Sequence, residues 1–119
     1  SAKDHAESFL MLESGRASAF MMDDILLAGE KSKAKEPAKW HIVGTAPIHE
    51  IYGCMMRKGD ADFKQVVDDA IKATYASGEI NAMYKKWFES PIPPKNVNLN
   101  FPMSDDIKAL IATPHDKDE

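Results

Sequence analysis

The chain of 119 residues is long enough for one modest domain, and its hydrophobic share of 44% is enough for a real core. Its net charge of −4, with scattered Lys and Arg, argues against a nucleic-acid partner, because phosphates require a concentrated basic face. No apolar run approaches the roughly 20 residues that span a bilayer, and the chain does not start with a signal-peptide pattern, so we expect any targeting segment to lie outside it.

The first third of the chain alternates between helix and strand patterns. A capping-box pattern at Asp4 predicts a short helix that ends at Gly15. The apolar run 17–22 predicts a buried strand, and a second helix then extends to about residue 33. Residues 40–44 form the next predicted strand. This alternation predicts an α/β fold, in which helices flank a parallel sheet.

The rest of the chain is dominated by two amphipathic helices. A third strand-like run, residues 50–57, precedes them, and Pro47 favours a linker just before it. Ser77 and Gly78 separate the two helices. The apolar residues of both helices recur at the spacing of one buried face: Phe63, Val66, Val67, Ala70, Ile71 and Thr74 in the first, and Ile80, Met83, Tyr84 and Trp87 in the second.

The last part of the chain is predicted to contain an extended segment, a short helix and a charged tail. Residues 96–101 alternate apolar side chains with Asn, which is typical of an extended segment on a surface or of an edge strand. Ser104 then caps a short helix that ends before Pro114. The charged tail 115–119 is expected to fray.

Asp23 lies where the first predicted strand ends. Ligands of open α/β sheets bind at the carboxyl ends of the strands, so a carboxylate at this position is a candidate ligand-binding group. The neighbouring Asp24 suits the N-cap of the following helix, which leaves Asp23 without that role. The alternative that Asp23 faces no ligand stays open.

Residues for metal, redox or covalent chemistry are sparse. Cys54 is the only cysteine, so no internal disulfide can form, and a small buried hydrophobe is the favoured role for it. The histidines have neither a partner at i, i+4 nor an intervening Glu: His5, His41, His49 and His115. The chain also has no phosphate-binding glycine loop, nucleophile elbow or Cys/His pair. We therefore predict no metal site and no cofactor.

Three stretches carry a resemblance to a known family. They are SFLMLESGRASAFMMDD at residues 8–24, YGCM at 52–55 and WFESPIPPKN at 87–96. In this order they closely resemble the carboxyl-terminal part of periplasmic glutamate/aspartate-binding proteins of ABC transporters. The element around residues 15–23 is shared by polar amino-acid-binding proteins in general, whereas His5 and the proline-rich stretch point to the acidic-amino-acid branch.

The resemblance implies a periplasmic binding protein type II-like fold, in which two α/β lobes close on a ligand. Only the carboxyl-terminal part of that fold is present here, namely half of lobe 2 and the returning part of lobe 1. Residues 1–46 would belong to lobe 2, residues 47–103 to lobe 1 with a tail in the hinge region, and residues 104–119 to a final helix and frayed tail.

The resemblance also implies a function and two site residues. The intact protein would capture L-glutamate or L-aspartate in the periplasm and deliver it to the membrane permease of an ABC transporter. Asp23 matches the carboxylate that receives the α-ammonium group of the ligand, and His5 matches the histidine that reaches the side-chain carboxylate. Tyr52 is a further candidate for the cleft wall. The groups that hold the α-carboxylate of the ligand lie outside this sequence.

Two alternatives and two consequences accompany this interpretation. A dehydratase-like enzyme on the same fold would depend on His5 or Asp23 as acid or base. A ligand-sensing receptor ectodomain would require a membrane-spanning segment after residue 119.

With half of a binding cleft, the chain alone is expected to bind acidic amino acids weakly. Its exposed strand edges and apolar faces favour self-association.

Overall fold

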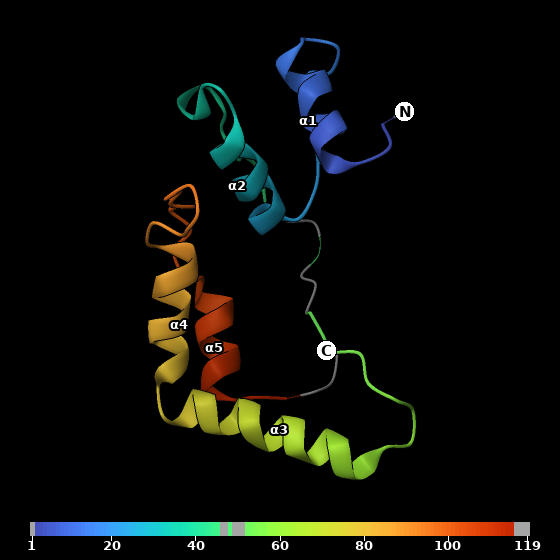
Figure 1. Ribbon diagram of the computed structural model, residues 1–119, viewed down its shortest axis with the longest axis vertical. Helices are drawn as coiled ribbons and strands as arrows, with labels where there is room; N and C mark the ends of the chain where they lie inside the picture. Colours follow the sequence, from blue (N-terminus) through green and yellow to red (C-terminus); the bar gives the residue numbers. More distant parts are fainter. Residues whose placement is uncertain (1, 46–47, 49–51, 116–119) are drawn as a thin grey trace.

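Helices dominate the computed structural model, which describes residues 2–45, 48 and 52–115. They follow each other in the predicted order: α1 (His5–Glu13), α2 (Asp24–Lys33), the 3-10 turn η1 (Pro37–Lys39), α3 (Ala61–Ala76), α4 (Glu79–Phe88) and α5 (Asp105–Ala112). Figure 1 shows α1 and α2 in the upper part of the molecule and α3, α4 and α5 in the lower part. Contacts join α1 to α2, α2 to η1, and α3 to α4.

Polar side chains begin two of these helices as predicted. The Asp4 carboxylate accepts a hydrogen bond of 2.8 Å from the backbone N–H of Glu7 at the start of α1. The Ser104 hydroxyl accepts one of 3.3 Å from the N–H of Ile107 at the start of α5. Each bond satisfies a backbone donor that has no partner inside its own helix. The sequence therefore predicted both helix starts from local chemistry.

Glycines end α1 and α3 at the predicted places. After α1, the Gly15 N–H bonds to the Leu12 carbonyl at 3.0 Å, and the Arg16 N–H bonds to the Met11 carbonyl at 2.9 Å. This pair of bonds is the Schellman motif, which needs a left-handed residue, and Gly15 supplies it with φ of 72°. Gly78, with φ of 75°, makes the corresponding turn between α3 and α4.

The start of α2 differs by one residue from the prediction. The N-cap is Asp23, and Asp24 is the first helical residue, so the prediction of Asp24 as the cap was wrong. The Asp24 carboxylate instead accepts a 2.7 Å hydrogen bond from the adjacent Ile25 N–H. In the first turn it still lies close to the positive end of the helix dipole, which favours a carboxylate at either position.

The predicted strands are not formed within residues 2–45, 48 and 52–115. Segments 17–22, 40–44 and 52–57 have no ladder, whereas residues 50 and 51 of the third run lie outside the described residues. Segment 96–101 does not form an edge strand either, and Val97 makes only an isolated antiparallel bridge with Ile92. A strand satisfies its backbone through a neighbour, and these segments do not pair with one another. The strand half of the α/β prediction is therefore not seen among the residues that the structure describes.

Aromatic packing forms two small buried centres. In the upper part, the buried Phe9 of α1 meets Trp40 edge to face, with ring centroids 5.5 Å apart, and Ala28 of α2 is buried as well. In the lower part, the buried Tyr84 of α4 packs against Phe88 at 4.5 Å. No described side chain is less than 2% exposed.

The molecule exposes far more surface than a compact domain of this size. Its accessible surface is 9698 Å², whereas a folded monomer of 13.2 kDa exposes about 6,400 Å². Its radius of gyration is 17.3 Å, against about 13.5 Å for a compact domain. About a third of the surface therefore corresponds to faces that a compact domain would bury.

Two predictions of burial were wrong for this reason. The face of α3 that was expected to be buried is open, with Phe63 52% and Val66 65% exposed, and α3 has no buried residue. Cys54 was expected to be a buried small hydrophobe and is exposed. Helix periodicity fixes which side chains share a face, but a second element must be present to cover it.

Candidate functional site

Asp23 stands at the junction between the first predicted strand and α2. The polar end of the apolar run and the start of the helix place it there, with backbone angles φ −53° and ψ 135°. Its side chain is partly buried and makes no capping hydrogen bond to the helix. A carboxylate at the amino end of a helix that makes no capping bond can bind a cation or a hydrogen-bond donor.

Tyr52 supplies a hydrogen bond to this carboxylate. Its hydroxyl donates to Oδ2 of Asp23 across 29 positions of sequence. Tyr52 is 73% exposed, so the bond lies at an open surface. The sequence marked Tyr52 as a candidate for the cleft wall but gave no sign of this contact, because no local pattern reports a pairing over such a separation.

His5, the second predicted site residue, is the first residue of α1 and is exposed. Within the described residues no hydrogen bond or ion pair joins it to Asp23, so the structure does not bring the two side chains into direct contact. Their helices do contact each other. Both residues therefore belong to the upper part of the molecule.

The amino end of α2 also influences a buried tyrosine. Burial raises the pKa of Tyr84, and the carboxylates of Glu89 and Asp24 raise it further. The Tyr84 hydroxyl is buried and has no hydrogen-bond partner among the described residues. Neutral phenol is therefore the favoured form in the folded chain.

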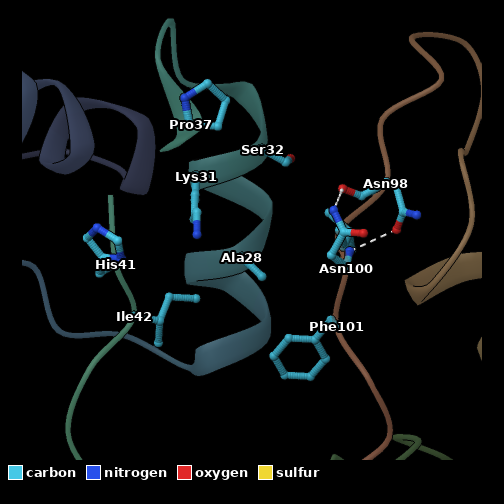
Figure 2. A pocket seen from close by; sticks show the side chains of 10 residues that line it. Ala28, Lys31, Ser32, Pro37, His41, Ile42, Asn98, Asn100 and Phe101 are labelled. Atoms are coloured by element: carbon cyan, nitrogen blue, oxygen red, sulfur yellow. Dashed lines mark hydrogen bonds between the residues drawn. The ribbon is translucent and has the colours of Figure 1, made fainter. Parts of the chain in front are cut away.

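A hollow of about 300 Å³ lies along α2, away from Asp23. Figure 2 shows the helix with Lys31, His41 and Ile42 on one side and with Asn98, Asn100 and Phe101 on the other. Asn98 accepts a 2.8 Å hydrogen bond from the Asn100 N–H. The hollow thus places residues 98–101 beside α2, but the predicted extended form does not hold throughout segment 96–101, because Asn96 and Asn100 have φ of 52° and 50°. Neither Asp23 nor His5 lines the hollow.

The part of the chain that the structure describes has neither a metal-binding cluster nor a membrane-spanning helix. There, His, Cys, Asp and Glu side chains form no group of three or more that could hold a metal ion. Among these same residues, no helix has both the length and the apolar character needed to cross a membrane.

Comparison with known proteins gives three close relatives. The L-glutamate/L-aspartate-binding protein of Pseudomonas aeruginosa is 68% identical over 117 residues. The glutamate/aspartate import solute-binding proteins of Salmonella typhimurium and Escherichia coli are each 58% identical over 117 residues. Each alignment covers 98% of this chain but 39% of the relative. The chain therefore spans about two fifths of the length of these relatives.

A more distant relative and a family profile extend this result. The glutamine-binding protein of an ABC transporter in Bacillus subtilis is 28% identical over 87 residues, which cover 73% of this chain and 31% of that protein. The profile of bacterial extracellular solute-binding proteins, family 3, matches residues 3–90, about three quarters of the chain. The chain therefore belongs to family 3 of the bacterial extracellular solute-binding proteins, a membership that implies the periplasmic binding protein type II fold.

Proposed function

We propose that the chain is the carboxyl-terminal part of the substrate-binding component of an ABC transporter. The full-length binding protein, meaning a solute-binding protein that contains this chain, captures glutamate or aspartate in the periplasm and delivers it to the membrane permease. The observation that carries this proposal is the 68% identity to an L-glutamate/L-aspartate-binding protein over 98% of the chain. The named relatives bind or import solutes, so the enzyme and receptor alternatives receive no support.

Asp23 is the proposed partner of the α-ammonium group of the ligand. The helix leaves its carboxylate available, because α2 takes no capping bond from it. A charge-assisted hydrogen bond to an ammonium group contributes about 1.5–3 kcal/mol, and a cleft that excludes water strengthens it.

His5 is the proposed partner of the side-chain carboxylate. It is exposed at the amino end of α1, where an imidazole can donate a hydrogen bond whether neutral or protonated. The contact between α1 and α2 keeps the two proposed residues in one region. Asp23 would thus bind the α-ammonium group of an acidic amino acid, and His5 would bind its side-chain carboxylate.

The proposed lobe division places residues 1–46 in lobe 2 and residues 47–103 in lobe 1. In support, α1 contacts α2 and α3 contacts α4, whereas Figure 1 shows the two pairs in different parts of the molecule. Residues 104–119, which include α5, form the proposed final helix and tail. The remaining strands and helices of both lobes would come from the part of the full-length protein that lies outside this chain.

Self-association of the isolated chain is a further proposal. About 3,300 Å² of surface exceeds the expectation for a compact monomer of 13.2 kDa. This excess is several times the roughly 800 Å² that each partner buries in a standard protein interface. A second copy of the chain would cover the open apolar faces. The isolated chain should also bind glutamate weakly, because half of the cleft is missing.

Calorimetry on the full-length binding protein tests the proposed function. We expect glutamate or aspartate to bind more tightly than glutamine. Asp23→Asn should weaken binding of glutamate and of glutamine, because both carry an α-ammonium group. His5→Ala should weaken glutamate selectively, and Lys72→Gln, on an exposed part of α3, is the matched control. Absence of binding of any acidic amino acid to the unsubstituted protein would contradict the proposal.

A further inference from the structure

The behaviour of Asp23 differs from that of the comparable helix caps. Asp4, Asp60 and Ser104 each turn back and accept a hydrogen bond from the N–H three residues on, at the starts of α1, α3 and α5. Asp23 holds the same position before α2 but makes no such bond. Its carboxylate is instead bonded to the hydroxyl of Tyr52. The hydrogen-bond partner of Asp23 is thus not a nearby backbone N–H but a side chain 29 residues further along the sequence.

This replacement has a definite effect on the carboxylate. Tyr52 donates to Oδ2, and no described residue donates to Oδ1, so the second oxygen stays available. A carboxylate can accept several hydrogen bonds at its two oxygens. The Tyr52 hydroxyl therefore restricts the rotation of the group without occupying the oxygen that an incoming donor needs.

The donor is also neutral, which matters for binding a cation. An Arg or Lys at this position would cancel the negative charge of Asp23, whereas a phenol, with an ordinary pKa of about 10, leaves it in place near neutral pH. A neutral donor thus orients the carboxylate and keeps its attraction for an ammonium group. The neutral Tyr52 phenol therefore suits a site where Asp23 binds a cation better than it suits a structural ion pair.

From these observations we propose that Tyr52 is a positioning residue for ammonium recognition by Asp23, an inference that rests on the proposed function. Tyr52 acts through Asp23 and does not itself need to touch the ammonium group. In the proposed division, Asp23 belongs to lobe 2 and Tyr52 to the segment that returns to lobe 1. The bond therefore links the ammonium site to the crossing between the lobes.

The test compares variants of the full-length binding protein with two ligands. Glutamate carries the α-ammonium group, and glutarate has the same two carboxylates without it. Tyr52→Phe keeps the aromatic ring and removes only the hydroxyl. Tyr75→Phe removes a hydroxyl from α3 and is the matched control. Titrations to high millimolar ligand, followed by NMR, keep weak binding measurable in every variant.

We expect Tyr52→Phe to weaken glutamate binding about tenfold, which corresponds to about 1.4 kcal/mol. Glutarate binding and the melting temperature should not change. Asp23→Asn should weaken glutamate at least a hundredfold, and adding Tyr52→Phe to it should cause no further loss. This non-additivity is the sign of a residue that acts through another.

Other outcomes separate the two proposals. If Tyr52→Phe leaves glutamate affinity unchanged, or weakens glutamate and glutarate equally, Tyr52 is not a positioning residue, although the proposed function survives. The same conclusion follows if the two substitutions are additive. If the unsubstituted full-length protein binds no acidic amino acid, the proposed function itself fails.

Discussion

The pairs α1–α2 and α3–α4 are both helix contacts between neighbours in the sequence, yet they bury their apolar residues very differently. The first pair buries Phe9 and Ala28, and the loop after it brings Trp40 onto Phe9. In the second pair α4 buries Tyr84, whereas α3, the longest described helix, buries no residue although its apolar stripe is well formed. An apolar stripe therefore predicts which face of a helix packs against a partner, but it does not show that the partner is present.

Removing the aromatic centre of the first pair should have the largest effect on stability. Phe9 is 7% exposed, so Phe9→Ala in the full-length binding protein should lower the free energy of unfolding by about 3 kcal/mol. Leu10→Ala, at the next and exposed position of α1, should cost less than about 1 kcal/mol. Urea unfolding followed by circular dichroism measures both. Equal losses would show that Phe9 is no better packed than the exposed Leu10.

The open face of α3 gives the second prediction, which concerns the isolated 119-residue chain. If a second copy covers this face, Val66→Glu should raise the dissociation constant of the self-associated form at least tenfold, because a carboxylate would have to enter an apolar contact. Lys72→Gln, on the same helix, should have no effect. Analytical ultracentrifugation over a range of concentrations measures the constant. An unsubstituted chain that stays monomeric at all concentrations would contradict the idea.

A smaller effect is expected from Tyr84 of α4. Besides burial, carboxylates near both helix pairs affect its pKa: Glu89 after α4 and Asp24 in α2. Burial, with Glu89 and Asp24, raises its pKa above the ordinary value of 10.0. The unfolded chain therefore loses this proton at a lower pH than the folded chain does. The contribution of Tyr84 to stability is complete below about pH 10 and is lost as the pH rises through the folded-state pKa.

Tyr84→Phe in the full-length binding protein should remove this alkaline loss. Since the hydroxyl is buried without a hydrogen-bond partner among the described residues, the substitution should be neutral or slightly stabilising at pH 7. Melting temperatures at pH 7 and pH 10.5 measure the difference. A marked loss of stability at pH 7 would show that the hydroxyl is satisfied in the full-length protein by a group outside this chain.

The contrast between features set by a local stretch of chain and features that need a distant neighbour explains what could be predicted from the sequence. Asp4, Gly15, Gly78 and Ser104 marked helix ends correctly, because their effects act within a single turn of backbone. Segment 17–22 was predicted as a strand from its apolar residues, but a strand also requires a neighbour to share its hydrogen bonds. The relatives are much longer than this chain, so those neighbours can lie in the part that it does not span.

The candidate site was predictable only in part. Position alone identified Asp23, and the family resemblance gave His5 a role that its residue type could not. Whether either residue binds a ligand stays a prediction. The Tyr52 bond was missed because two residues separated by 28 others leave no common pattern in the sequence. The one-residue shift at the start of α2 came from two adjacent aspartates, either of which suits a helix start.

The exposed thiol of Cys54 has a practical consequence. It is the only cysteine in the chain, it is open to solvent, and it follows Tyr52 by two positions. On this chain a maleimide dye would therefore attach at a single known place, two residues from Tyr52. If glutamate capture changes the surroundings of the Tyr52–Asp23 bond, a dye on Cys54 would report it as a change of emission.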